Sequence, residues 1–160
     1  MTLEQRAAAL LEQCRSQGIK VATAESCTGG MLAALLTSVP GSSDVFDCSF
    51  VTYSNEAKKR MLGVSHELIA EHGAVSRECA LAMAHGAILE SAATLAVSIT
   101  GAAGPGGGTT AKPVGLVHFA CALRNGATLH REERFGDIGR AGVRTASVEV
   151  ALELLEAQLL

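Results

Sequence analysis

Aromatic residues are scarce in this sequence. It contains no Trp, one Tyr and four Phe among 160 residues, and only three Pro. Hydrophobic residues nevertheless make up 48% of the chain and charged residues 18%, which is typical of a folded globular protein and excludes a disordered one. The core must therefore consist of Ala, Leu, Val and Ile. The length suits one domain, residues 1–160.

Basic runs and long apolar runs are also missing. The formal net charge is −3, and no run of Lys and Arg exceeds the three residues 58–60. Because nucleic-acid surfaces favour a basic stripe with stacking aromatics, we expect no nucleic-acid partner. No uninterrupted apolar run approaches the roughly 20 residues of a membrane span. Glu4, Arg6 and Glu12 interrupt the N-terminal segment, so we expect neither a signal peptide nor a membrane partner.

The sequence lacks the spacings of disulfide frameworks and metal sites. Its five cysteines are odd in number and form no C-x-x-C pair, and its five histidines form no H-x-x-x-H or H-x-H pair. We therefore expect most cysteines to be small buried hydrophobic residues, and we expect no metal and no cofactor. Free thiols without an export signal favour a cytoplasmic protein.

Apolar periodicity predicts a chain in which helices and strands alternate. Expected helices cover 3–17, 31–39, 56–62, 65–72, 76–91 and 139–159, and expected strands cover 19–24, 45–53, 93–100, 114–123 and 127–135. The pair Asn125-Gly126 predicts a hairpin between the last two strands. We expect an α/β fold, a three-layer α/β/α sandwich with a mixed central sheet. Its many apolar helical faces leave room for a subunit interface, and we expect a homo-oligomer.

Three polar or glycine-rich segments follow predicted strands, where open α/β sheets bind ligands. The first, 24–30, carries Ser26, Thr28, Gly29 and Gly30 at a strand–helix junction, and such a junction can bind anions or simply form a capped turn. The second, 101–108, has five glycines in eight residues. It lacks the ending of a P-loop, and it either approaches a ligand closely or forms a flexible connection. The third is 53–58.

Lys58 is a candidate general base in the third segment. It lies near the start of a predicted helix, where the helix dipole is positive and disfavours a cation. With Lys59 and Arg60 beside it, these influences favour loss of its proton, and a neutral lysine can deprotonate a serine. The alternative is a solvated surface lysine.

Candidate nucleophiles are Ser26, Ser42 and Ser43. Ser43 sits in a Pro-Gly-Ser-Ser-Asp turn, and turn serines often bond only to their own backbone. No G-x-S-x-G elbow occurs, so a serine hydrolase here would be of Ser–Lys type. Arg140 and Arg144 lie on one face of the last predicted helix. They form either a phosphate or carboxylate site or a pair of ordinary exposed arginines.

Six segments together resemble one known family, the C-terminal domain of competence/damage-inducible protein A, whose members include nicotinamide-nucleotide amidases. The resemblance rests on TAESCTGG (23–30), PGSSDVF (40–46), FVTYSNEAK (50–58), HGAVS (72–76), SITGAAGPGGG (98–108) and KPVGLVHFA (112–120). It covers nearly the whole chain, and these motifs are long and rare.

The resemblance implies a three-layer sandwich that hydrolyses nicotinamide mononucleotide to nicotinic acid mononucleotide and ammonia, without metal or cofactor. By the same resemblance, Ser43 and Ser26 fall on active-site serines, and Tyr53 and Lys58 on the family's tyrosine and lysine. The substrate-binding positions that we expect are Thr28, Gly29, Gly30, Thr100, Gly101, Gly104 and Arg140.

On this hypothesis Ser43 attacks the carboxamide and Lys58 takes its proton, with Tyr53 relaying or orienting that proton. Ser26 is the second choice of nucleophile. Backbone N–H groups near Ser43, or the hydroxyls of Ser26 and Thr28, would hold the oxyanion. The alternatives are a non-catalytic nucleotide-binding or interaction module, which need not keep a Ser–Tyr–Lys set, and a DNA-associated factor, which the charge balance disfavours.

Overall fold

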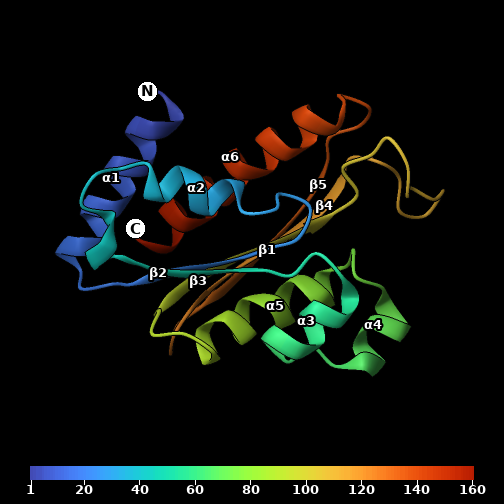
Figure 1. Cartoon of the computed structure of the whole chain (residues 1–160), viewed down its shortest axis with the longest axis horizontal. Helices are drawn as coiled ribbons and strands as arrows, with labels where there is room; N and C mark the ends of the chain where they lie inside the picture. Colours follow the sequence, from blue (N-terminus) through green and yellow to red (C-terminus); the bar gives the residue numbers. More distant parts are fainter.

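The computed structural model describes residues 1–160 and contains one five-stranded sheet between two layers of helices (Figure 1). The strands are β1 (Val21–Glu25), β2 (Phe46–Val51), β3 (Leu95–Gly101), β4 (Leu116–Leu123) and β5 (Thr128–Arg134). The helices are α1 (Leu3–Ser16), α2 (Met31–Thr37), α3 (Asn55–Leu62), α4 (His66–His72), α5 (Arg77–Leu89) and α6 (Arg140–Gln158). A short 3₁₀ turn, η1 (Ser42–Asp44), precedes β2.

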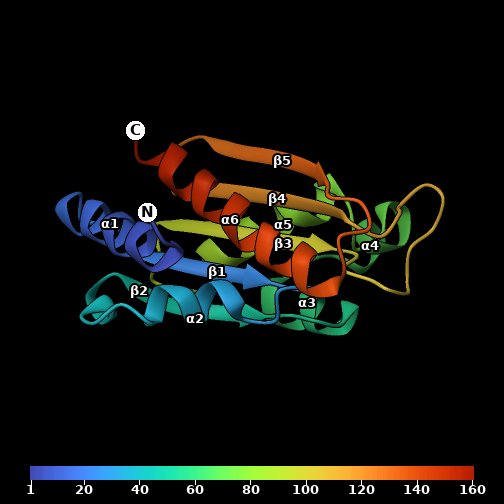
Figure 2. The ribbon, with the colours of Figure 1, turned by 90° about the horizontal axis from the view of Figure 1, so that it is seen from above.

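The sheet is mixed and has the strand order β2-β1-β3-β4-β5. β1 pairs in parallel with both β2 and β3, whereas β4 pairs antiparallel with β3 and β5. The carboxyl ends of β1, β2 and β3 therefore meet at one edge of the sheet. Figure 2 looks onto the face covered by α1, α2 and α6, and this edge lies toward the right. The predicted fold class, a three-layer α/β/α sandwich with a mixed sheet, is confirmed.

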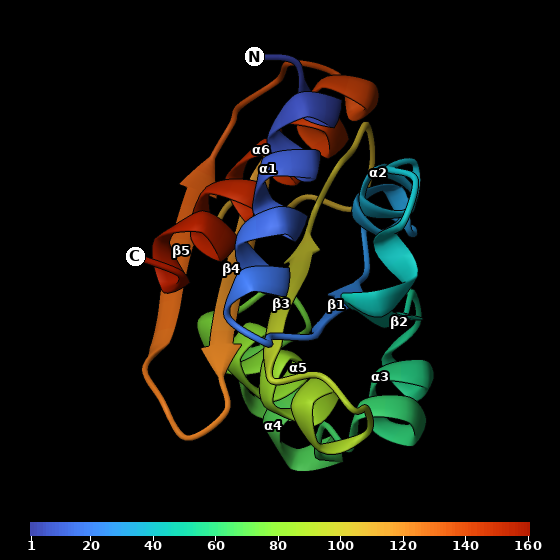
Figure 3. The ribbon, with the colours of Figure 1, turned by 90° about the vertical axis from the view of Figure 1, so that its left-hand side faces the viewer.

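The helices divide between the two faces of the sheet. Helices α1, α2 and α6 cover one face, and α3, α4 and α5 cover the other (Figures 1 and 3). Because successive side chains of a strand point to opposite faces, β1 sends Val21 to the first core and Ala22 and Ala24 to the second. Each face thus has its own apolar core.

The core under α5 is built from small side chains. On this face both the strands and α5 contribute alanines, and α5 adds Met83. The alanines are Ala22, Ala24, Ala96, Ala120 and Ala122 from the sheet and Ala80, Ala84 and Ala87 from α5. Small residues on both surfaces let the helix lie close to the sheet and to α3. This close packing explains how the chain fills its core with few aromatics.

The element boundaries differ from those expected by at most three residues, mostly because caps end the helices early. Helix α2 stops at Thr37, and the 3₁₀ turn shortens the strand expected at 45–53 to Phe46–Val51. The hairpin predicted from Asn125-Gly126 is confirmed. Asn125 adopts a left-handed φ of 59°, and the N–H of Gly126 donates to the carbonyl of Leu123. None of the helices is both long and apolar enough to cross a membrane.

Candidate active site

A cavity of about 260 Å³ opens at the edge where β1, β2 and β3 end. All three segments that follow these strands reach it. Its lining includes side chains from the turn after β1, from the β2–α3 junction, from the end of β3 and from the start of α6: Ser26, Cys27, Tyr53, Asn55, Lys58, Thr100 and Arg140, together with glycines 101, 104, 106 and 107. Ligands bind in this position in open α/β sheets.

Lys58 is buried at the floor of the cavity, with 1% of its surface exposed. Ser54 caps α3 with its hydroxyl, and Lys58 is the fourth residue of that helix, so its side chain turns inward from the positive end of the helix dipole. Its Nζ lies 2.9 Å from Ser26 Oγ, 2.7 Å from the Thr52 carbonyl oxygen and 3.3 Å from the Tyr53 carbonyl oxygen. The solvated surface lysine considered above is thereby excluded.

The surroundings of Lys58 favour its neutral form. Burial lowers its pKa from the ordinary value of 10.5, and only two neighbouring thiols act weakly in the other direction. A neutral amine has two N–H donors and one lone pair, whereas the ammonium has three donors and no acceptor. The carbonyls of Thr52 and Tyr53 can only accept, so in the neutral amine they take both N–H groups and the lone pair is directed at Ser26 Oγ.

Ser26 is held directly after β1 in a tight turn. Its N–H donates to the carbonyl of Ile99 at 3.0 Å, which continues the pairing of β1 with β3, and its carbonyl accepts from Gly29 at 3.1 Å. The N–H groups of Cys27 and Thr28 donate to no carbonyl within the chain. Two backbone donors therefore remain available directly after the serine.

Ser43 does not reach this cavity. It lies exposed in η1, which precedes β2, whereas Lys58 contacts the carbonyls that follow β2. The six residues of β2 separate the two ends by roughly 20 Å at about 3.3 Å per residue. We therefore correct the preference for Ser43 over Ser26: the structure brings Ser26, and not Ser43, to Lys58.

Residues 28–30 form the turn and do not line the cavity. Thr28 is fully buried, and its hydroxyl donates to the Glu25 carboxylate at 2.7 Å. Gly29 and Gly30 have φ of 55° and 100°, which side chains rarely adopt, and Gly30 is the N-cap of α2. These three residues were expected to contact substrate, but the structure gives them the task of shaping the turn.

Thr100, Gly101 and Gly104 do line the cavity. The Thr100 hydroxyl donates to the carbonyl of Ala74 at 2.8 Å, which ties β3 to the segment before α5. A Cβ on Gly101 would lie 2.6 Å from Val117 Cγ2 and 2.8 Å from the Leu116 carbonyl oxygen. Only glycine fits between β4 and the cavity at this position.

Arg140 and Tyr53 close one side of the cavity mouth. The guanidinium of Arg140 donates from Nη1 to the Gly104 carbonyl at 2.7 Å and from Nη2 to the Tyr53 hydroxyl at 2.9 Å. Tyr53 is 61% exposed. The Tyr53 hydroxyl thus points toward Arg140, and the Tyr53 backbone carbonyl accepts from Lys58. The hydroxyl forms no hydrogen bond with Lys58, so the geometry does not support the proton relay through Tyr53 that was expected.

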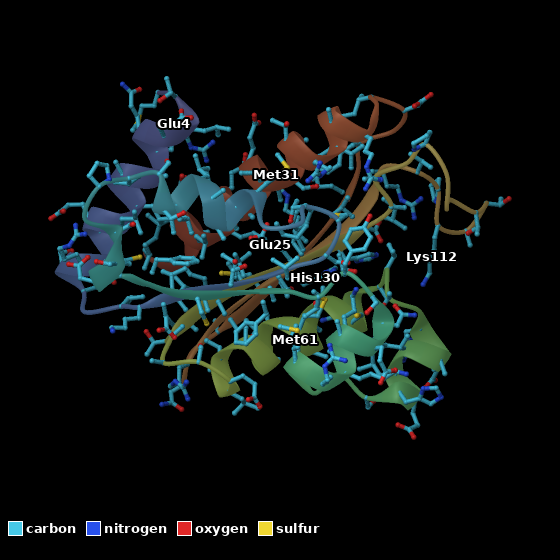
Figure 4. All side chains as sticks on the ribbon, in the orientation of Figure 1. Glu4, Glu25, Met31, Met61, Lys112 and His130 are labelled. Carbon is cyan, nitrogen blue, oxygen red and sulfur yellow. The ribbon has the colours of Figure 1, made fainter.

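Sequence reasoning missed Glu25, which lies in the interior between the sheet and α2 (Figure 4). Its carboxylate accepts hydrogen bonds from the Thr28 hydroxyl and from the first amides of α2. An acidic residue at the end of an otherwise apolar strand was the available signal. No group of three or more His, Cys, Asp or Glu side chains is arranged to hold a metal ion.

The fold and the cavity place the chain among α/β proteins that carry a ligand site at the carboxyl ends of parallel strands. Residues 3–159 match the model of the CinA C-terminal domain family. The chain belongs to that family.

Two relatives show the range of proteins that contain this domain. The chain is 49% identical over 147 residues to the nicotinamide-nucleotide amidohydrolase PncC of Escherichia coli, covering 91% of this chain and 88% of that protein. It is 45% identical to a putative competence-damage inducible protein of Caldicellulosiruptor saccharolyticus, of which it spans 36%. The chain thus spans about a third of the longer curated relatives that it matches.

Solved structures agree with the architecture. The competence/damage inducible protein CihA from Agrobacterium tumefaciens superposes with a TM-score of 0.95 at 54% identity, over 97% of this chain and 94% of that one. The competence damage-inducible protein A from Klebsiella pneumoniae gives a TM-score of 0.94 at 34% identity, over 99% and 98%.

Proposed function

We propose that this chain is an amidohydrolase that converts nicotinamide mononucleotide and water to nicotinic acid mononucleotide and ammonia. The observation that carries the proposal is the buried Lys58 Nζ, 2.9 Å from Ser26 Oγ with two carbonyls occupying its N–H groups. The similarity to the Escherichia coli nicotinamide-nucleotide amidohydrolase supplies the substrate.

In the first half of the proposed reaction, Ser26 Oγ attacks the carboxamide carbon and its proton passes to the Lys58 lone pair. The N–H group of Cys27, which lines the cavity and donates to no backbone carbonyl, is placed to stabilise the oxyanion that forms. Lys58 then gives its proton to the amide nitrogen, the C–N bond breaks and ammonia leaves. An ester between the pyridine carboxyl and Ser26 remains.

In the second half, water attacks this ester and Lys58 accepts the proton of the water. The bond between the carboxyl carbon and Ser26 Oγ breaks, and the same proton returns to Oγ. Each cycle thus consumes one water and releases one ammonia, and both Ser26 and Lys58 return to their starting states.

Arg140 and the glycine-rich segment are proposed to bind the substrate phosphate. Arg140 is the one guanidinium that lines the cavity, and the lining contains no carboxylate that would repel an anion. The pairing of Arg140 with the Gly104 carbonyl and the Tyr53 hydroxyl leaves its positive charge uncompensated at the mouth. A phosphate can bind there.

The proposed setting is a reducing cytoplasm, because all five cysteines are free and four of them are buried. The expected homo-oligomer stays a prediction.

Ammonia release from nicotinamide mononucleotide tests the proposal directly. Ser26→Ala and Lys58→Ala should each lower kcat by at least about 10³-fold, because nucleophile and base act as one unit. Ser43→Ala is the matched control, because it also removes a serine hydroxyl, but at the end of the sheet away from the cavity. It should keep wild-type kcat.

Loss of activity in Ser43→Ala with retention in Ser26→Ala would reverse the assignment. No ammonia from a folded wild-type protein that still binds the nucleotide would instead leave a non-catalytic binding module.

A further inference from the structure

The turn that carries Ser26 accepts hydrogen bonds from, and donates them to, charged side chains on two sides. From α6, Arg144 donates from Nε to the Cys27 carbonyl at 3.1 Å and from Nη2 to the Thr28 carbonyl at 3.3 Å. From the interior, one Glu25 carboxylate oxygen accepts from the Thr28 hydroxyl at 2.7 Å. Arg144 therefore holds both residues that follow Ser26, and Glu25 holds the second of them, Thr28, from the other side.

The Glu25 carboxylate also fixes the start of α2. It accepts from the Leu32 and Ala33 N–H groups, both at 3.0 Å, and Gly30, which caps the helix, has no side chain to do so. Glu25 is fully buried, and a buried carboxylate is costly unless hydrogen bonds satisfy it. Its placement thus joins the end of β1, the turn and α2 into one rigid unit.

Arg144 is not placed to bind substrate. It does not line the cavity, and its Nε and Nη2 donate to the turn carbonyls, whereas Arg140, one helical turn earlier, lines the cavity mouth. A Cβ on Gly29 would lie 3.5 Å from Arg144 Nη2, so the guanidinium lies directly against the turn. The two arginines of α6 therefore have different tasks.

We propose that Arg144 and Glu25 are positioning residues that hold the Ser26 hydroxyl in line with Lys58. Neither side chain touches the reacting atoms. They act through residues 27 and 28, and the backbone N–H group of Cys27 is also the proposed oxyanion donor. The inference rests on the proposed function, because it concerns the geometry of the Ser26 attack.

The test compares Arg144→Ala and Arg144→Lys with wild type in the full chain. Arg6→Ala is the matched control, because Arg6 also ties an element to α6 with two guanidinium bonds, here to Glu156 at 3.2 and 3.0 Å, away from the cavity. Since a displacement of about 1 Å can cost about 10²-fold in rate, Arg144→Ala should lower kcat about 10- to 100-fold with KM changed less than about 3-fold.

The lysine variant keeps a donor and should recover part of kcat. The control should keep wild-type kcat even where its thermal midpoint falls as far as that of Arg144→Ala. Wild-type kcat in Arg144→Ala would overturn the proposal. A rise in KM with kcat unchanged would also overturn it, because that result defines a substrate-binding arginine.

Hydrogen exchange separates this proposal from the hydrolase itself. Backbone amides of residues 26–30 should exchange faster in Arg144→Ala and in Glu25→Gln than in wild type, whereas Arg6→Ala should leave them unchanged. Glu25→Gln keeps the shape of the side chain but replaces one acceptor oxygen by an N–H₂ donor. This donor then faces a backbone N–H group of α2, so one hydrogen bond is lost. Unchanged exchange in both variants overturns the proposal, whether or not wild type releases ammonia. Absence of ammonia from wild type, with exchange raised as expected, rejects the hydrolase alone.

Discussion

Lys58 combines two properties that rarely coincide in one residue, deep burial and the absence of a paired carboxylate. Its partners are a hydroxyl and two carbonyls, and burial lowers its pKa from 10.5. The same burial that makes the ammonium costly favours the free amine, which is the form that a general base requires.

This lowered pKa gives a prediction for the pH dependence of activity. The proposed base is the neutral amine, so kcat/KM should rise with pH through the Lys58 pKa, with a midpoint below pH 10.5, and then level off. Lys58→Arg should be inactive throughout, since a guanidinium does not lose its proton. Initial rates of ammonia release at subsaturating substrate measure the profile. A wild-type profile that is flat from about pH 6 to about pH 10 would contradict a lysine base.

At the scale of elements, the contact between α3 and α5 controls where Lys58 sits. Gly86 of α5 packs against the end of α3, and a Cβ at this position would lie 2.1 Å from the Leu62 carbonyl oxygen. Because that atom belongs to the backbone, no side-chain rotation relieves the clash. α3 would have to move away from α5, and Lys58 with it.

Gly86→Ala should therefore lower the free energy of unfolding by about 1–3 kcal/mol, although alanine gains about 1 kcal/mol over glycine in a helix. Gly142→Ala in α6 is the control, since its Cβ meets only the exposed Ile138 side chain at 3.2 Å, and it should be neutral or stabilising by up to about 1 kcal/mol. Urea unfolding measures both. Equal stabilities for the two variants would show that α3 yields without cost.

At the scale of the whole molecule, local patterns predicted the order of elements but not the partner of Lys58. Alternation and helical periodicity indicated each strand and helix, and Asn125-Gly126 indicated the hairpin. The choice between Ser26 and Ser43 depends on which end of a parallel strand each residue occupies. Ser26 follows β1 and Ser43 precedes β2, so only Ser26 lies at the edge that Lys58 reaches.

The task of Arg144 was equally hidden from the sequence. Its partners, the Cys27 and Thr28 carbonyls, lie 117 and 116 positions away along the chain. Their approach depends on α6 packing beside α2 on the same face of the sheet. The spacing of Arg140 and Arg144 predicted that they share a helix face. It could not show that Arg144 binds the turn carbonyls whereas Arg140 lines the cavity.

The two ends of the chain lie on one side of the molecule, remote from the cavity and at opposite ends of α1, because Gln13 and Gln17 bind the Leu159 carbonyl. Met1 and Leu160 line the same surface hollow between α1 and α6, and Figure 1 shows both ends opposite the glycine-rich segment next to the cavity. The Asn125-Gly126 turn also lies at the edge of the sheet away from the cavity, because β4 runs antiparallel to β3.

The topology is thus open to circular permutation. The old ends can be joined by a flexible linker of about ten residues, long enough to span α1. A chain that contains this linker, begins at Gly126 and ends at Asn125 should fold and release ammonia at the wild-type kcat. Circular dichroism and the ammonia assay measure this, and a folded but inactive permutant would show that the cavity depends on the continuity of β4 with β5. The same geometry lets a further domain be attached at either end without covering the cavity mouth, so the domain can be carried as a self-contained module.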